Sequence, residues 1–280
     1  MGWELPALGA AFSVLLMLPL AIKWKLTQPL ALAGVAAVTV VAALSFFWIY
    51  PLCETRWWLA AGLFGQTAVA LALALSLMMV CLWRDPERIP IEKDEVVLSP
   101  ADGEVLHIRT VDEGSMPLVT KGGRDYLLRE LMGTSLSASA AQVIGVEMNF
   151  LNVHVNRCPV AGQVKLLRRI EGKFLSLRQD KAPFVNERLT TIIENSSLTV
   201  AVVQVASRLV RCIQSYLSMG ETVCVGQRLG IIRFGSLVVV VLPRREDVRV
   251  EVKPGDRVTA GISVLARYQR YQVNDEGAES

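Results

Sequence analysis

The stretch Leu229-Gly-Ile-Ile-Arg-Phe-Gly-Ser-Leu-Val-Val-Val-Val-Leu242 contains two apolar runs separated by a single Gly-Ser pair. Runs of β-branched residues of this length are typical of β-strands, and a continuous apolar run is typical of a strand buried on both faces. We therefore predict strands over 229–234 and 237–242. Gly235 and Ser236 lie between these two runs, where a glycine often marks a bulge or a kink.

Similar short runs recur from about Val96 onward and are broken by Gly, Pro and Asp. This spacing predicts a mostly β soluble domain. Further strands are assigned to 104–108, 163–167 and 198–203. Segment 111–145 is less regular and rich in Gly, Ser and Ala, so we interpret it as an insertion or a lid, with a helix only over 125–132.

Two segments of this part share a G-x-x-V-x-x-G pattern, Gly220-Glu-Thr-Val-Cys-Val-Gly226 and Gly255-Asp-Arg-Val-Thr-Ala-Gly261. Such a turn-and-strand unit recurs in barrel-sandwich domains of the lipoyl or biotinyl kind. Two unrelated β-turns explain the pattern equally well, because Gly beside Asp or Glu is common turn chemistry. The predicted fold class is a mostly β, barrel-sandwich-like soluble domain with an N-terminal transmembrane helical anchor.

The first 83 residues are mostly apolar, and charges become frequent only from Arg84 onward. Three apolar stretches run roughly over 5–22, 29–53 and 57–83, and the last two exceed the roughly 20 residues that span a bilayer. The first is shorter and contains two prolines. We predict a membrane anchor of two or three apolar helices over 1–83, a soluble domain over 84–273, and a polar tail over 274–280.

Positive charges next to the apolar stretches set the expected orientation. Lys23 and Lys25 lie between the first two stretches, and Arg84 and Arg88 follow the third. Placing all four on one side of the membrane satisfies the positive-inside rule for two spans or for three. We expect a protein of the inner membrane with its soluble domain on the cytoplasmic face.

Composition argues against several other classes of protein. The net charge of +3 is too small to indicate nucleic-acid binding. The five cysteines are odd in number and include no C-x-x-C pair, so a disulfide framework is not expected. Two histidines without a Cys/His cluster give no metal-binding pattern.

The Gly235-Ser236 pair has a chemical interpretation beside the structural one. A serine hydroxyl can attack the preceding carbonyl when the backbone is strained, and glycine at that position removes the side chain that would block the attack. The resulting ester can undergo β-elimination to dehydroalanine, which hydrolyses to a pyruvoyl group. A pyruvoyl group formed in this way needs no external cofactor.

Three other motifs carry candidate functional residues. Asp102, in Ser99-Pro-Ala-Asp-Gly103, lies in turn chemistry and either shapes the turn or orients a histidine. His154 lies in an alternating apolar run and is either a structural residue or a group for proton transfer. Arg157 can hold a phosphate or a carboxylate. Arg84 and Arg88 either flank the membrane or contact lipid phosphate.

Seven motifs occur in an order that resembles the short, bacterial/archaeal-type phosphatidylserine decarboxylase proenzymes over about residues 83–270. They are Arg84-Asp-Pro-Glu-Arg88, Ser99-Pro-Ala-Asp-Gly103, Asn152-Val-His-Val-Asn-Arg157, Gly172-Lys-Phe174, Asn186-Glu-Arg188, Gln204-Val-Ala206 and Ile232-Arg-Phe-Gly-Ser236. The resemblance implies self-cleavage between Gly235 and Ser236, which gives two chains from one proenzyme. It also implies a covalent pyruvoyl group made from Ser236.

The resemblance further implies the reaction and the roles of the candidate residues. The pyruvoyl carbonyl would form a Schiff base with the amine of the serine headgroup and accept the electrons released as CO2 leaves, which would give phosphatidylethanolamine. Ser236, His154 and Asp102 match the family's catalytic positions, and Arg157, Arg84 and Arg88 are the candidates for substrate binding. The expected partner is a membrane phospholipid, and a homo-oligomer is left open.

The chain departs from the family pattern at several positions. Arg157 stands where longer members have a second histidine, Leu237-Val-Val replaces Arg-Val-Asp, and Ser207 replaces a glycine. These departures keep two alternatives open, a processing-deficient lipid-binding relative and a membrane-tethered barrel-sandwich adaptor. A differently tailed serine lipid would present the same headgroup as phosphatidylserine.

Overall fold

In the computed structural model, the chain divides into two compact units, Met1–Trp83 and Arg84–Ser280. The structure describes residues 83–92, 94–112, 119–121, 124–126, 128–134, 140–149, 151–177, 179, 181–207, 213–232 and 236–269, and scattered helical positions before residue 83. Most of the predicted anchor over 1–83 and the whole of the predicted tail over 274–280 lie outside these residues. Among the described positions, none of the helices has both the length and the apolar character needed to cross a bilayer.

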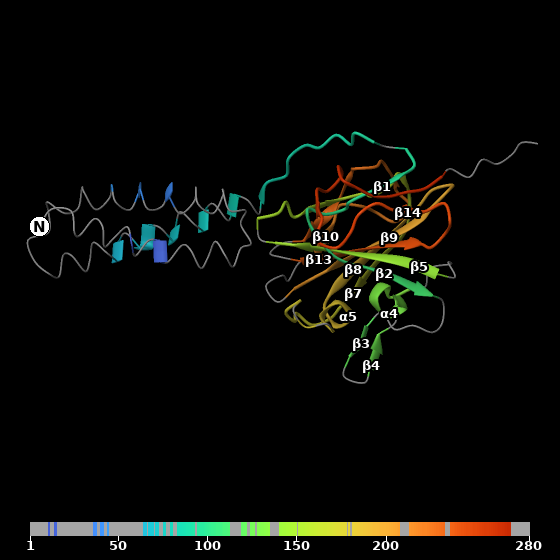
Figure 1. Cartoon of the computed structure of the whole chain (residues 1–280), viewed down its shortest axis with the longest axis horizontal. Helices are drawn as coiled ribbons and strands as arrows, with labels where there is room; N and C mark the ends of the chain where they lie inside the picture. The colour runs from blue at the N-terminus through green and yellow to red at the C-terminus, as the bar shows by residue number, and fades with distance from the viewer. Residues whose placement is uncertain are drawn as a thin grey trace, which may run out of the picture. The chain divides into compact units, whose positions relative to one another are not determined.

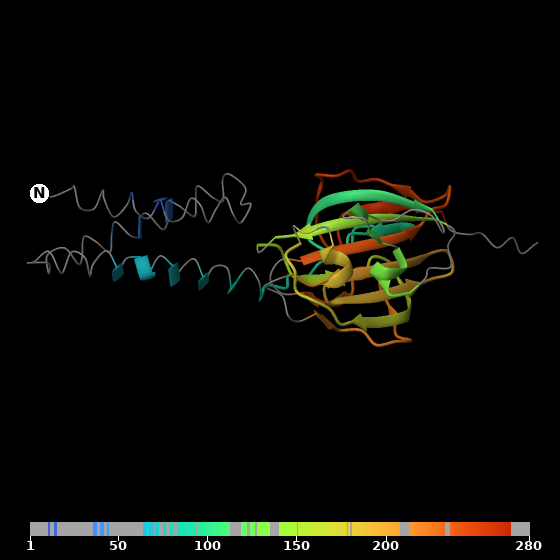
Figure 2. The same cartoon turned by 90° about the horizontal axis from the view of Figure 1, so that it is seen from below.

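The centre of the second unit is an eight-stranded antiparallel sheet with the order β11-β7-β8-β9-β13-β5-β2-β15. Its strands are β2 (Gly103–Asp112), β5 (Ala140–Met148), β7 (Gly162–Ile170), β8 (Arg188–Glu194), β9 (Thr199–Val205), β11 (Thr222–Val223), β13 (Ser236–Pro243) and β15 (Arg257–Val258). The strands are strongly curved (Figure 2). The prediction of a mostly β soluble domain is confirmed.

Three smaller sheets complete the unit (Figure 1). One contains β1 (Val96–Leu98), β16 (Val264–Arg267) and β14 (Arg249–Val250), and another contains β10 (Ile213–Ser215), β12 (Arg228–Ile232) and β6 (Val155–Arg157). The hairpin of β3 (Val119–Lys121) and β4 (Arg124–Tyr126) lies within the irregular segment 111–145. Two short helices, α4 (Leu128–Met132) and α5 (Ala182–Val185), lie against the large sheet.

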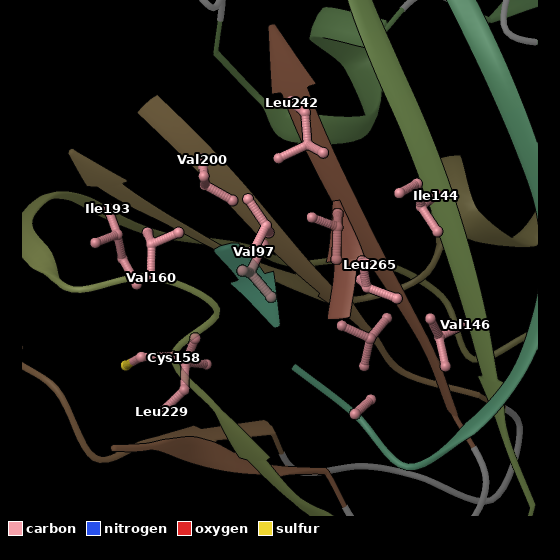
Figure 3. Packing of buried hydrophobic residues seen from close by; sticks show 14 of the residues in the cluster. Val97, Ile144, Val146, Cys158, Val160, Ile193, Val200, Leu229, Leu242 and Leu265 are labelled. Atoms are coloured by element: carbon pink, nitrogen blue, oxygen red, sulfur yellow. The ribbon is translucent and has the colours of Figure 1, made fainter. Parts of the chain in front are cut away.

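Strand β13 is buried on both faces, as its continuous apolar sequence predicts. Val238, Val240 and Leu242 belong to the main core, which residues of the two three-stranded sheets also line. Figure 3 shows Leu242 in this cluster together with Val97, Leu229 and Leu265 of those sheets. Leu237, Val239 and Val241 point the opposite way, into a second core that α4 and α5 cover. Successive residues of one strand therefore serve two cores.

The two G-x-x-V-x-x-G segments make equivalent hydrogen bonds. The N–H groups of Gly220 and Gly255 donate to the carbonyls of Val164 and Val105, and those of Gly226 and Gly261 donate to Cys158 and Ser99, all at 2.8 Å. Each segment thus folds onto a Pro-x-x-Gly-x-Val stretch, 159–164 in one case and 100–105 in the other. Their strands, β11 and β15, form the two edges of the large sheet. The internal similarity is a structural repeat, not a pair of unrelated turns.

Predicted and observed elements differ mainly at their ends. The strand predicted over 229–234 is β12 (Arg228–Ile232), and residues 233–235 lie outside the described part. The helix predicted over 125–132 begins only at Leu128, because residues 124–126 pair with β3 instead. A lid role for segment 111–145 stays a prediction.

Candidate functional site

Ser236 is the first residue of β13, between two other strands of the large sheet. Its Cα pairs with that of Met148 at the end of β5, and Leu237 pairs with Val205 at the end of β9. Gly235, on the other side of the predicted scissile bond, lies outside the described residues, as does the Ser236 side chain. The structure therefore gives the strand position of residue 236 and leaves self-cleavage a prediction.

His154 immediately precedes β6, and its side chain is fully buried. Val153 and Val155, on either side of His154, pack with Ile231 in a small separate cluster. The His154 carbonyl accepts a hydrogen bond from the N–H of Ile232, 3.1 Å away, at the end of β12. His154 is thereby tied to the strand that precedes Gly235 and Ser236.

Burial sets the protonation state of His154. Desolvation lowers the pKa of the imidazole to about 4, although a hydrogen bond with the Asn152 backbone and the charge of Asp102 raise it in part and Arg84 lowers it further. The ring is therefore neutral near pH 7 and can accept a proton.

Asp102 is buried, and its carboxylate accepts hydrogen bonds from three residues. Arg88 donates through Nη1 to Oδ1 at 2.5 Å and through Nη2 to Oδ2 at 2.9 Å. The backbone N–H groups of Ala260 and Val153 add bonds of 2.8 and 3.3 Å. Asp102 thus holds the backbone just before His154, and its charge also acts on the His154 ring.

The segment Arg84–Arg88, here called the 84–88 strap, is held against the domain along its length. Arg84 donates through Nη2 to the Leu151 carbonyl at 2.6 Å, and Asp85 accepts from Arg228 Nε at 2.5 Å. Glu87 also pairs with Arg228. Together with the Arg88–Asp102 pair, these contacts make the strap part of the domain.

Arg157 binds the same strap from inside the domain. Its guanidinium is buried and donates to the Pro86 carbonyl at 2.8 Å, to Asp85 Oδ1 at 3.3 Å and to the Gly226 carbonyl at 3.0 Å. Desolvation lowers the pKa of Arg157, and Asp85 partly offsets this shift. Gly261 borders it at φ 70°, and a Cβ there would lie 2.9 Å from Arg157 Cδ.

Of the three arginines proposed to bind substrate, Arg88 and Arg157 are therefore engaged with protein groups, and only Arg84 makes its contact at the exposed surface. Headgroup binding by any of the three stays a prediction. The described residues contain no group of three or more His, Cys, Asp or Glu side chains arranged for a metal ion.

Among the described residues, hollows lie beside the strap and on one face of β13. One of about 560 Å³ lies beside the 84–88 strap and is lined by Glu87, Arg88, Pro90, Arg157, Tyr216 and residues 224–228. The other, of about 300 Å³, lies on the face of β13 that carries Leu237 and Val239, and includes His107 and Glu147. Burial lowers the pKa of His107, and Arg109 lowers it further.

Sequence reasoning missed two groups of residues at this site. Asp85 and Arg228 form a hydrogen-bonded ion pair that holds the strap to the domain. Local sequence does not predict this pair, because the two residues lie 143 positions apart. The buried amides of Asn156 and Gln204 hydrogen-bond each other at 2.7 Å across 48 positions. Both amides lie in motifs noted above, but only the fold brings them together.

The chain is similar to known proteins over the same region. A family model described as phosphatidylserine decarboxylase matches residues 75–266. A putative archaetidylserine decarboxylase proenzyme of Methanocaldococcus jannaschii is 35% identical over 69% of this chain and 91% of its own length. Phosphatidylserine decarboxylase proenzymes of Symbiobacterium thermophilum and Azorhizobium caulinodans are 38% and 36% identical, over 74% and 81% of this chain and 86% and 90% of their own lengths.

A β domain in which a buried neutral histidine is tied to the strand that precedes a Gly-Ser pair in the sequence defines a class of candidate self-processing enzymes. The comparisons identify the family within that class. The chain belongs to the phosphatidylserine decarboxylase family and is a carboxy-lyase, as the resemblance predicted.

Arg88→Leu is expected to lower the free energy of unfolding by about 3 kcal/mol, because it leaves the buried Asp102 carboxylate without its charged partner. Adding Asp102→Asn to this variant is expected to recover more than half of the loss, since no buried charge then remains. Arg228→Leu is the control. Its pairs are exposed, and the cost is expected to stay below about 1 kcal/mol. Thermal unfolding of the purified chains measures all three. Equal losses of unfolding free energy for Arg88→Leu and Arg228→Leu would contradict the description of Arg88–Asp102 as a buried ion pair.

Stability is expected to fall as the pH drops from about 6.5, the ordinary histidine pKa, toward the native His154 pKa of about 4. The unfolded chain takes up the proton first, so the contribution of the neutral ring is complete above this window and is lost below it. His154→Gln is expected to reduce the difference in melting temperature between pH 7 and pH 4.5. His107→Gln, at a less buried histidine, is expected to retain most of it. A profile unchanged by His154→Gln would refute the buried neutral state.

Proposed function

We propose that this chain decarboxylates a serine-headgroup phospholipid with a pyruvoyl group that it makes from its own Ser236. The observation that carries the proposal is the position of residue 236 as the first residue of a buried central strand, with a buried neutral histidine tied to the preceding strand. Family membership supports the decarboxylation itself. The covalent group and the roles of individual residues are the parts proposed here.

Maturation would proceed in three balanced steps. The Ser236 oxygen attacks the Gly235 carbonyl carbon and displaces the amide nitrogen, which gives an ester. Elimination then removes the Ser236 Cα proton, breaks the Cβ–O bond and releases Gly235 as a carboxylate. Water finally hydrolyses the resulting dehydroalanine. Its nitrogen leaves as ammonia, and the pyruvoyl carbonyl remains. The neutral His154 imidazole has a nitrogen lone pair that can accept the hydroxyl proton, and its pKa of about 4 makes it a weaker base than an ordinary histidine.

A carbonyl group made from Ser236 would lie at the start of β13, where Met148 pairs with residue 236 and Val205 with residue 237. The group, when present, supplies an electrophile that captures the substrate amine and accepts the electron pair left by CO2. His154, neutral and excluded from solvent, can hold or return a proton beside it. Arg88 and Asp102 would fix the backbone before His154, since Asp102 accepts the Val153 N–H.

The lipid is assigned by its headgroup. The similar proteins are named for phosphatidylserine and for archaetidylserine, which share a serine headgroup and differ in their tails. Phosphatidylserine is the proposed substrate of this chain. The substitution of Leu237 for the usual arginine does not favour a processing-deficient relative, because Leu237 is 3% exposed and packs in the second core.

Ser236→Ala is expected to abolish cleavage, because it removes the attacking oxygen. Intact-mass spectrometry of the wild-type chain is expected to show two fragments, with the fragment 236–280 lighter than a serine-ended chain by one ammonia molecule. Cys224→Ser, at an exposed position away from the cleaved bond, is the matched control and should cleave as the wild type does. An intact wild-type chain in its native membrane would count against the proposed function.

We also propose that the domain works at the cytoplasmic face of the inner membrane. The lysines and arginines that flank the apolar stretches support this orientation, and a lipid substrate requires access to a membrane. At the start of the domain, the exposed side chains of Ile89 and Ile91 suit contact with lipid, at 80% and 86% exposure.

The orientation can be read from Cys224, whose side chain is exposed. In a chain with Cys53, Cys81 and Cys212 replaced by Ser, a membrane-impermeant maleimide is expected to label Cys224 only after the cells are opened. The remaining Cys158 is an internal control, because burial raises the pKa of its thiol to about 12 and keeps it unreactive. Labelling of Cys224 in intact cells would reverse the proposed orientation.

A further inference from the structure

A chain of buried amides lies beside the strand position of Ser236. Asn156 and Gln204 are both fully buried, and Gln204 Nε2 donates to Asn156 Oδ1 at 2.7 Å. Asn156 Nδ2 donates in turn to the sulfur of Met148 at 3.7 Å. Met148 is the residue whose Cα pairs with Ser236, and Gln204 pairs with Val238, two residues further along β13.

The histidine of the site, His154, lies two residues before Asn156 in the sequence. His154 immediately precedes β6 and Asn156 lies within it, and both side chains are fully buried, whereas Val153 and Val155 pack with Ile231 in a separate cluster. The imidazole and both amides are fully buried, and the amides reach Met148, which pairs with the first residue of β13.

The sulfur of Met148 fixes the direction of the amides. A thioether accepts hydrogen bonds and cannot donate them, so the Asn156 NH2 group must face it. The Asn156 oxygen is then left to accept from the Gln204 NH2 group. Gln204 Oε1 remains as a buried acceptor with no hydrogen-bond partner among the described residues. Reversing both amides would set an oxygen against the sulfur.

A buried acceptor without a donor destabilises the fold by an amount comparable to a lost hydrogen bond. Such a group in a core is explained when another molecule supplies the donor. An N–H or an O–H can fill this acceptor, and the proposed substrate carries N–H groups in its primary amine. The amide carbonyl is also the end of a neutral dipole, which favours a positively charged nitrogen in a site of low dielectric.

We propose that Gln204, oriented by Asn156, accepts a hydrogen bond from the amine of the serine headgroup and so selects primary-amine substrates. This inference rests on the proposed function, because it places the amine at the group made from Ser236. Asn156 is a positioning residue, and Met148 sets its orientation.

The test uses a double variant, Asn156→Leu with Gln204→Met, which replaces both amides by apolar side chains of similar size. Removing both partners of a buried hydrogen bond leaves no orphaned group, so the melting temperature is expected to be unchanged or raised. The control is Thr191→Val. It removes another buried hydroxyl without a partner among the described residues, on the neighbouring strand β8, and should not affect amine capture.

Three readouts separate the roles. Intact mass gives the fraction of chain that is cleaved, and reduction with borohydride alone gives the fraction that carries a carbonyl. Incubation with a short-chain ethanolamine phospholipid and cyanoborohydride gives the rate of amine capture. The double variant is expected to cleave and to carry the carbonyl, but to capture the amine about 10- to 100-fold more slowly, as befits the loss of a hydrogen bond to a charged group.

Three results would overturn the inference. They are amine capture at the wild-type rate, a melting temperature well below that of the wild type, and loss of cleavage in a variant that melts normally, since the last would assign the amides to maturation. A wild-type chain that cleaves and captures the amine while the variant captures it equally well removes only this inference. A wild-type chain without a reducible carbonyl removes the proposed function as well.

Discussion

The ion pair between Arg88 and Asp102 is the contact on which the arrangement of the site depends. Its carboxylate also accepts from the backbone of Val153 and Ala260, so three separate parts of the chain converge on the two carboxylate oxygens of Asp102. A bidentate guanidinium–carboxylate pair fixes both distance and direction, which a lysine would not do. Because Val153 precedes His154, this pair holds the backbone next to the imidazole, and the 84–88 strap becomes part of the domain.

The internal repeat explains why this carboxylate is where it is. The stretches Pro100-Ala-Asp-Gly103 and Pro159-Val-Ala-Gly162 occupy equivalent turns, and both glycines are required, since a Cβ would lie 2.2 and 2.4 Å from the carbonyl oxygens of Glu147 and Glu194. One turn carries Asp102 and the other carries Ala161. The same turn is thus purely structural where it carries Ala161, and it holds the carboxylate of the site where it carries Asp102.

Much of this could be predicted from local sequence, because local pattern controls it. The apolar run 237–242 specifies a strand with two buried faces, and glycines at fixed spacing specify the repeated turns. The pairing of Arg88 with Asp102 could not be predicted, because a charged segment after an apolar stretch has the same composition whether it flanks a membrane or binds a domain. The Asn156–Gln204 pair was hidden for a related reason, since side-chain partners 48 residues apart depend on strand register.

The core of this domain must be apolar for stability and must also hold the polar groups of the site. The strand that begins at Ser236 lies among valines and leucines, where a polar group is costly unless it is paired. Low dielectric keeps His154 neutral and strengthens any hydrogen bond made beside it. The same surroundings make an unfilled acceptor such as Gln204 Oε1 destabilising. The stability lost at that oxygen is consistent with a site organised for an incoming amine, because a core selected for stability alone would place an apolar side chain there.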